Sequence, residues 1–302
     1  MAVIAPPSSA SSASSLALSP GRVALRRALR HGSFWVGGGI LAAIVLAAVF
    51  APLLTPFDPT WQDLSKRLLP PVWNSQGGWE HPLGTDQLGR DYLARLIYGG
   101  RISLLIGLVT VLISGVIGTA LGVAAGYWGG QVDLFINFVL TIRLTLPVVL
   151  VALVVVALIG NSLTVLMAVI GLLLWDRFAI VTRSATQQVA SREFIVAAQA
   201  IGSSTGRILL REILPNITGP LIVVASIELA HAVLLEAALS FLGLGVLPPL
   251  FTWGLMIAEA KNQLFFRPWL IAIPGAALVA LIFAINLVGD AVRDVTAPEG
   301  RA

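Results

Sequence analysis

Residues 102–128 read ISLLIGLVTVLISGVIGTALGVAAGYW, and this stretch, which contains no charged side chain, decides the fold. As a helix it would be about 40 Å long, enough to cross the roughly 30 Å hydrocarbon core of a bilayer. The chain of 302 residues is 57% hydrophobic and 11% charged, whereas ordinary globular proteins are about 25% charged. This composition excludes a soluble domain, a disordered chain and a disulfide-stabilised secreted module, so the chain is predicted to lie in a membrane.

Windows of similar length and hydrophobicity recur along the chain and predict an all-α membrane protein with six transmembrane helices. The predicted helices cover residues 34–54, 102–128, 134–159, 163–181, 217–242 and 270–290.

These helices divide the chain into parts with different expected surroundings. The expected parts are a cytoplasmic tail (1–33), the first helix (34–54), an extracytoplasmic loop (55–101), the core transmembrane domain (102–290) and a second cytoplasmic tail (291–302). The loop is rich in Pro, Trp and Gly. Near its end, residues 91–98 (DYLARLIY) have the apolar spacing of an interfacial helix.

The orientation follows from four arginines, Arg22, Arg26, Arg27 and Arg30, that precede the first apolar stretch. Because Lys and Arg stay on the cytoplasmic side of inserted helices, both termini of a six-span chain are expected in the cytoplasm. A signal peptide has the same order of parts but a shorter apolar region of about 7–15 residues, so we expect an uncleaved first helix. The net charge is only +4, without a basic stripe interleaved with aromatic residues, which argues against a nucleic-acid partner.

No catalytic machinery is visible in the sequence. The chain contains no cysteine, which excludes thiol catalysis and thiolate metal sites. It also lacks the phosphate-binding Gly-x-x-x-x-Gly-Lys-Ser/Thr loop and the His-Glu-x-x-His and Gly-x-Ser-x-Gly motifs. We therefore expect no enzyme activity, cofactor or metal in this chain, and the energy for any active transport must come from an ion gradient or another subunit.

The second predicted helix carries a small residue at every fourth position. These residues are Ser114, Gly118, Gly122 and Gly126. Such spacing lets another helix approach the backbone closely, since packing replaces the hydrophobic driving force within lipid. The pattern predicts a packing face within this chain, with a subunit interface as the alternative.

Charged residues within the predicted helices are candidates for function, because burying a charge in a bilayer is costly. Arg143 lies in the third apolar stretch, followed by Pro147. In the fifth, Glu228, His231 and Glu236 fall within about 140° of arc on one helical face. This face is predicted either to line the path of a polar solute or to form a buried polar network. A supporting set of metal ligands is absent, so no metal site is expected.

Residues 191–215 (SREFIVAAQAIGSSTGRILLREILP) predict two short helices outside the membrane. Ser191 can cap a helix that runs through Ala200, and Gly202 suits a left-handed stop. Ser203 or Ser204 can start a second helix that Pro215 ends. The pair could seat in a groove on another protein or rest on the membrane surface as an amphipathic connector.

Four stretches of the chain carry a recognisable pattern. The loop described above contains Val196-Ala197-Ala198, Gly202 and Leu214-Pro215, and the other stretches are 81–90 (HPLGTDQLGR), 236–245 (EAALSFLGLG) and 286–294 (NLVGDAVRD). Together they resemble the inner-membrane permease subunits of ABC importers, most closely the C-type subunit of dipeptide and oligopeptide permeases. The cytoplasmic loop of that family reads Glu-Ala-Ala, three residues, Gly and later Leu-Pro.

Three departures from the family pattern stand out. Val196 replaces the glutamate that opens the loop motif, and Glu212 stands where the pattern favours Ile. Glu193 lies about one helical turn before Val196. The charged pair Asp176-Arg177 interrupts the fourth apolar stretch.

The resemblance implies a type I ABC importer permease fold and a function in importing dipeptides or oligopeptides across the cell membrane. It implies a second homologous permease subunit, two ATPase subunits that bind ATP and Mg, and an extracytoplasmic solute-binding protein as partners. The ATPases would dock on a coupling loop. The residues that the resemblance assigns to this loop are Arg192, Glu193, Val196, Ala197, Ala198, Gly202 and Pro215.

Three alternatives remain open at the level of sequence. A permease of the same family could import nickel, glutathione or another small solute. A self-contained secondary transporter would use Arg143, Glu228, His231 and Glu236 as an ion-coupled site. A membrane scaffold would carry no solute at all.

Overall fold

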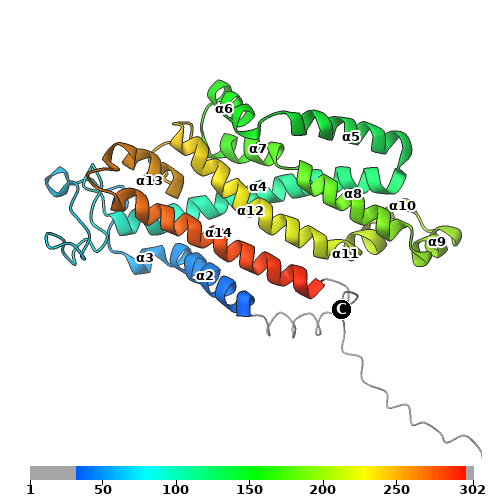
Figure 1. Cartoon of the computed structure of the whole chain (residues 1–302), viewed down its shortest axis with the longest axis horizontal. Helices are drawn as coiled ribbons and strands as arrows, with labels where there is room; N and C mark the ends of the chain where they lie inside the picture. The colour runs from blue at the N-terminus through cyan, green and yellow to red at the C-terminus, as the bar shows by residue number, and fades with distance from the viewer. Residues whose placement is uncertain (1–31, 297–302) are drawn as a thin grey trace, which may run out of the picture.

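The computed structural model describes residues 32–296, and the regular structure of this part is helical except for one isolated bridge between Thr85 and Asp91. Its longest helices are α2 (Gly32–Val49), α4 (Tyr92–Trp128), α12 (Thr218–Phe241) and α14 (Trp269–Thr296). Helices α4, α12 and α14 run along the long axis of the molecule (Figure 1). The core lies where these helices pack on one another and on the shorter helices of residues 148–173, and buried Leu, Ile, Val and Ala side chains fill it.

Five helical segments of the described part are long and apolar enough to cross a membrane, and a bent pair of helices makes a sixth. In chain order the spans are α2, α4, the bent pair α5 (Gly130–Thr145) and α6 (Val148–Ile159), the pair α7 (Leu163–Leu173) and α8 (Asp176–Ala190), α12, and α14. The prediction of an all-α membrane protein with six spans is confirmed when the bent pair is counted as one.

The third span differs from the prediction of a single helix over residues 134–159. Helices α5 and α6 meet at 83°. Pro147 stands between them as the residue before α6, and Leu146 has an extended backbone. A proline disfavours the helical conformation of the residue that precedes it, so the chain turns at this point.

Helix α4 begins well before the predicted start at residue 102. The carboxylate of Asp91 accepts a 2.6 Å hydrogen bond from the amide of Ala94 and so caps the helix. Residues 92–98 are therefore the first turns of a 37-residue helix and not a separate interfacial helix. At about 55 Å, this helix is longer than a bilayer core is thick.

The fourth span extends past its predicted end at residue 181. It breaks at Leu174 and Trp175, and α8 then continues to Ala190. Asp176 and Arg177 form the first turn of α8, so the break places two charged side chains within the span.

The small residues of α4 lie against α8. A Cβ atom added to Gly118 would lie 2.3 Å from the carbonyl oxygen of Trp175, and one added to Gly122 would lie 2.4 Å from that of Ala179. Gly126 is similarly close to Arg183, and Ser114 is fully buried on the same helix. This face therefore packs within the chain, where α8 leaves no space for another subunit.

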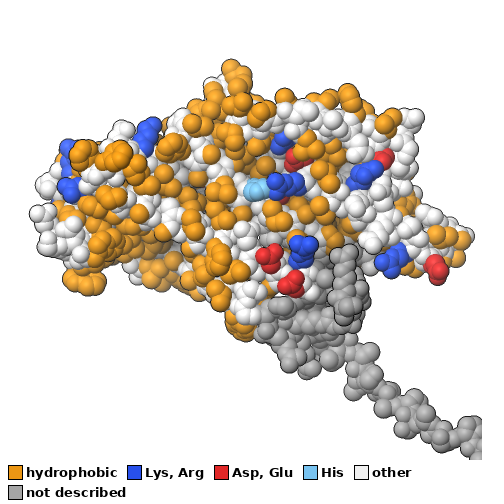
Figure 2. Space-filling view, viewed as in Figure 1, with side chains coloured by type: hydrophobic (Ala, Val, Ile, Leu, Met, Phe, Trp, Pro, Cys, Tyr) orange, Lys and Arg blue, Asp and Glu red, His pale blue; other side chains and the backbone are white. Residues whose placement is uncertain are grey.

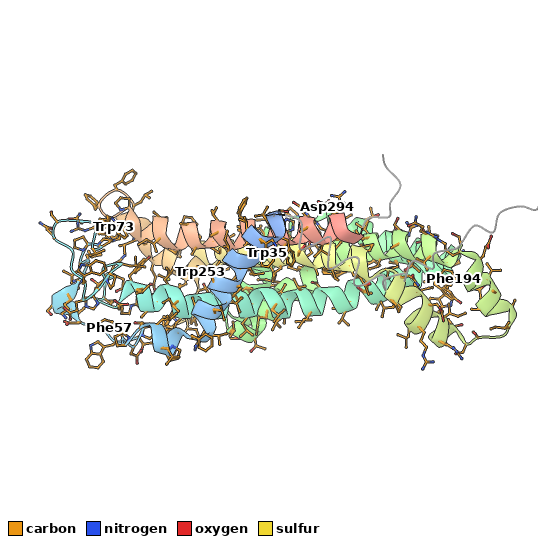
Figure 3. The ribbon with its side chains drawn as sticks, turned by 90° about the horizontal axis from the view of Figure 1, so that it is seen from below. Trp35, Phe57, Trp73, Phe194, Trp253 and Asp294 are labelled. Carbon is orange, nitrogen blue, oxygen red and sulfur yellow. The ribbon has the colours of Figure 1, made fainter. Side chains whose placement is uncertain are left out.

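The two ends of the molecule are built differently. Figure 3 places Phe57 and Trp73 at one end and Phe194 at the other. The first end holds the segment between α3 (Ala51–Leu54) and α4, with the short helix η1 (Leu64–Lys66), and α13 (Trp253–Ala260) with the turn η3 (Lys261–Gln263). Trp253 of α13 donates a 2.7 Å hydrogen bond to the carbonyl of Leu96 in α4. The sequence did not predict α13.

Candidate functional site

Three of the four charged residues singled out in the predicted helices line one cavity of about 500 Å³. Arg143 comes from the end of α5, and Glu228 and His231 come from α12. Asp176 and Arg177, at the start of α8, line the same cavity. Figure 2 shows charged side chains gathered in the middle of a largely apolar face.

At the centre of this cavity, Glu228 lies between a guanidinium and an imidazole. Nη1 of Arg177 is 3.3 Å from Oε1 of Glu228, and Nδ1 of His231 is 3.4 Å from the same oxygen. Glu228 is 1% exposed, whereas the side chain of Arg177 is 52% exposed and that of His231 is 38% exposed. The carboxylate is therefore held within the protein, while the two nitrogen-bearing groups face the open space.

Arg143 is held by the break between α7 and α8. Its Nε donates a 2.9 Å hydrogen bond to the carbonyl oxygen of Leu173, and its Nη2 lies 3.8 Å from Oδ2 of Asp176. Leu173 is the last residue of α7, where backbone carbonyls lack partners within the helix. The guanidinium thus satisfies a free helix end and balances the charge of Asp176.

Glu236 does not join this cluster, although it shares a helical face with Glu228. Its Oε1 accepts hydrogen bonds from Ser240, at 2.6 Å, and from Thr252, at 2.7 Å. Thr252 caps α13, so the fully buried Glu236 ties the end of α12 to the start of α13. The two alternatives for this helical face thus apply to different residues: Glu228 and His231 line the cavity, whereas Glu236, separated from them, lies in a buried polar contact. The separation also divides the His and Glu side chains that could have shared a metal.

Asp176 and Arg177 were not predicted from the sequence as members of the candidate site. Both stood out as charges that interrupt the fourth apolar stretch. Because charges within a membrane are costly, their position in an apolar stretch was the signal that could have assigned both residues to the site.

A second cluster of charges lies at the end of the molecule that holds α13. Oδ2 of Asp86 is 2.6 Å from Nε of Arg90 and 2.5 Å from Nη1 of Arg95. Oε2 of Glu259 is 3.0 Å from Nη2 of Arg90 and 2.8 Å from Nη2 of Arg95. The cluster joins the segment before α4 to α13, and its four charges sum to zero. We interpret this cluster as a structural contact that holds α13 against the segment before α4.

An exposed ion pair lies nearby in the same segment. Lys66 bonds to Glu80, and this hydrogen bond holds the pKa of the Glu80 carboxyl below its usual range.

The predicted coupling loop forms the opposite end of the molecule. Helix α9 (Glu193–Ala200) begins after Arg192, and Gly202 follows it with a φ of 77°. Val196 and Ala197 are exposed and Ala198 is half-buried. Phe194 and Ile201 are also exposed, whereas Ile195 is buried against Ile208, Ile213 and Ile217. The loop thus exposes apolar side chains, while the buried Ile195 packs it against the rest of the protein.

Two details of this loop differ from the prediction. Ser191 does not cap α9; its hydroxyl donates to the carbonyl of Gln188 in the preceding helix. The second helix does not end at Pro215. The chain passes from α10 (Thr205–Arg207) through a π-helical turn, η2 (Ile208–Ile213), into α11 (Leu214–Asn216), where Pro215 lies in the first turn. Early helical positions tolerate proline because their amide groups lack partners anyway.

Comparison with known families decides what kind of protein this is. The family described as the inner membrane component of binding-protein-dependent transport systems matches residues 118–300, more than half of the chain. The chain belongs to this family. The N-terminal transmembrane domain of oligopeptide transport permease C matches residues 19–71 of the permease. The permease is thus a multi-pass membrane protein of an importer.

Curated relatives extend the likeness over most of the permease. It is 37% identical over 264 residues to a dipeptide transport system permease protein of Haemophilus influenzae, covering 87% of this chain and 90% of the relative. It is 39% identical over 264 residues to a di/tripeptide transport system permease protein of Pseudomonas aeruginosa, covering 87% of each chain.

Among solved structures, the permease resembles a chain of the MetNI methionine ABC transporter in an inward-facing conformation. The TM-score is 0.56 at 17% identity, with 67% of this chain and 96% of the other covered. This likeness concerns the fold alone, which is that of an ABC importer permease.

Proposed function

We propose that the permease forms half of the path by which an ATP-driven importer carries dipeptides or oligopeptides across the cell membrane. Relatives named as dipeptide or di/tripeptide permeases are 35% to 39% identical to it over most of the chain, and this supports peptides as the solute class.

The observation that carries the proposal is the cavity of about 500 Å³ among the membrane-spanning helices, with charges of both signs on its wall. A peptide with free ends is a zwitterion and needs polar groups in place of its lost water. Arg143 and Arg177 can compensate a carboxylate, and Asp176 and Glu228 can compensate an ammonium group. Intramembrane charges of this kind mark solute pathways, and this supports the cavity as a segment of the path.

The two ends of the molecule suit different partners. The end that holds α9 faces the cytoplasm in the orientation set by the N-terminal arginines. There α9 and Gly202 would seat in a pair of ATPase subunits, which bind ATP and Mg. Residues 55–91 and 243–268, at the other end, would meet the solute-binding protein outside. A second, homologous permease would complete the path.

The exposed apolar side chains of α9 suit a role in coupling. Phe194 and Val196 of α9, and Ile201 directly after it, are large and exposed, whereas Ile195 of the same helix is buried. Rigid-body movement of the ATPases would be transmitted through such an element and would shift the permease between two states. Val196 offers an apolar contact where the family pattern has a glutamate.

The proposal is tested by purifying the permease with its partners and reconstituting the complex in proteoliposomes. We expect an ATPase pair and a second permease to copurify, and labelled dipeptide to enter only with ATP and the binding protein. Uptake of nickel or glutathione in place of dipeptide would correct the solute. Uptake by the purified chain alone, driven by a proton gradient, would overturn the proposal in favour of a secondary transporter.

A further inference from the structure

Arg177 is the cationic group of the cavity with the most unused hydrogen-bonding capacity. A guanidinium carries five N–H donors in a fixed planar fork. Within residues 32–296, its contacts are 3.3 Å to Glu228 and 3.5 Å to Nε2 of His231, and both run through Nη1. Its Nε and Nη2 donate no hydrogen bond within that part of the chain. Arg143 differs, because both its Nε and its Nη2 donate to the carbonyl of Leu173.

Glu228 is a counter-ion without a close hydrogen bond. Neither of its carboxylate oxygens accepts a hydrogen bond from the described part of the chain, although the residue is 1% exposed. Charge-assisted hydrogen bonds between nitrogen and oxygen are usually about 2.7–2.9 Å long. The 3.3 Å separation from Arg177 is therefore a loose ion pair. Such a pair compensates the positive charge of the guanidinium and leaves its Nε and Nη2 donors available to another acceptor.

The pair lies where two cavities meet. The cavity of about 500 Å³ and a second one of about 170 Å³ share Arg177 and Glu228 in their linings. On α12, Val224 and Ile227 line the smaller cavity and Leu234 lines the larger one. The two cavities thus follow one another along the helix, with the ion pair at their junction. A solute in either cavity therefore lies beside Arg177.

We infer that Arg177 binds a carboxylate group of the transported solute, which for a peptide is its C-terminal carboxylate, and that this group displaces Glu228 as the counter-ion. A bidentate pair between guanidinium and carboxylate uses the donors that Glu228 leaves free. The low dielectric of the surroundings strengthens that pair relative to water. Glu228 keeps His231, 3.4 Å away, when Arg177 turns to the solute. This inference rests on the proposed function of the cavity.

The absence of cysteine in this chain allows a direct test of binding. Leu234, which lines the larger cavity and is exposed, is replaced in the variant Leu234→Cys. In the complete complex of permeases and ATPases, its reaction with N-ethylmaleimide is read on this chain by mass. The binding protein is left out so that its own preference does not enter. The probes are glycyl-leucine and glycyl-leucine amide, which differ in the terminal carboxylate.

We expect glycyl-leucine to slow the labelling of Leu234→Cys. The amide should need a concentration about tenfold higher for the same protection, the loss typical of one charge-assisted hydrogen-bonded pair. Adding Arg177→Gln should raise the half-protecting concentration of glycyl-leucine by a similar factor. The matched control Arg183→Gln removes an arginine of the same helix that pairs with Asp133 outside the cavity, and it should leave protection unchanged.

A second variant keeps the test decisive if Arg177→Gln does not assemble. Glu228→Gln removes the competing counter-ion, so glycyl-leucine should protect at a lower concentration than in the parent. A purely structural ion pair predicts no such gain. Equal protection by the peptide and its amide, or no gain in Glu228→Gln, would overturn the inference.

Failure of the proposed function can be told apart from failure of this inference about Arg177. If the complex imports glycyl-leucine with ATP but the peptide and its amide protect equally, only the inference is lost. If the carboxylate-dependent protection is present but no peptide is imported, the function is lost and the carboxylate site remains.

Discussion

The guanidinium of Arg95, in the first turn of α4, lies 2.8 Å from the carboxylate of Glu259 in α13. Arg95 is 1% exposed and also bonds to Asp86. These contacts join three segments that are distant in the sequence, at the end where the binding protein is proposed to dock. The docking surface therefore depends on a buried charge network.

Replacing one member of this network should destabilise the permease. Glu259→Ala leaves the buried Arg95 with Asp86 as its remaining counter-ion; such a loss costs about 3–5 kcal/mol in fully buried pairs and should cost less here, because the Glu259 side chain is 31% exposed. We expect a clear fall in Tm for the purified protein in detergent. Lys66→Ala, which removes the exposed pair with Glu80, is the control and should leave Tm unchanged. An unchanged Tm for Glu259→Ala would contradict the structural role of the network.

The contact between α4 and α8 makes a second prediction. Gly122→Ala would place a methyl group 2.4 Å from the carbonyl oxygen of Ala179, and overpacking of this kind costs about 1–3 kcal/mol. Gly275→Ala, in α14, meets open space, so its Tm should be equal or higher, because alanine favours the helix. Equal Tm values for the two variants would show that the close packing is not as described.

A third prediction concerns the coupling loop. Gly202 has a φ of 77°, a left-handed conformation that β-branched residues adopt only with strain. Gly202→Val should abolish ATP-driven uptake while the protein still inserts in the membrane. Gly206→Val is the matched control and should transport normally, because Gly206 is the second residue of α10 and has open space around it. Normal uptake by Gly202→Val would count against coupling through this loop.

Glu236 supplies a fourth prediction. Its carboxylate accepts hydrogen bonds from Ser240 and Thr252 while fully buried. Glu236→Ala leaves two hydroxyl groups unsatisfied, which costs about 1–3 kcal/mol for each buried group. We expect lower Tm and reduced assembly, whereas Glu228→Ala should reduce uptake more than it reduces assembly. A stable Glu236→Ala variant that assembles normally but fails in uptake would contradict the structural role and would indicate that Glu236 lies on the solute path.

The number and order of the spans could be predicted from sequence because they depend on length and hydrophobicity, which are local properties. The bend at Pro147 and the early start of α4 at Asp91 were missed, although each has a local signal. Proline restricts the residue before it, and aspartate caps a helix. A window of mean hydropathy averages over both signals.

The candidate site was predicted only in part, for a geometric reason. The helical period tells which face a residue occupies but not at what depth it lies among neighbours. Glu228 and Glu236 share a face, yet eight residues of helix separate them by about 12 Å. Glu228 meets Arg177 of α8, and Glu236 meets Thr252 near α13. Which helix supplies the partner depends on tertiary packing, which the pattern within α12 does not encode.

The most direct test of the account asks whether peptide passes through the cavity of about 500 Å³. The measurement is ATP-driven uptake of labelled dipeptide by proteoliposomes that contain the complete complex with Leu234→Trp, which fills the cavity. Val279→Trp, at an exposed position of α14, is the control. If peptide passes through this cavity, Leu234→Trp blocks uptake while the complex still assembles, and Val279→Trp transports normally. Undiminished uptake by Leu234→Trp would contradict passage through the cavity.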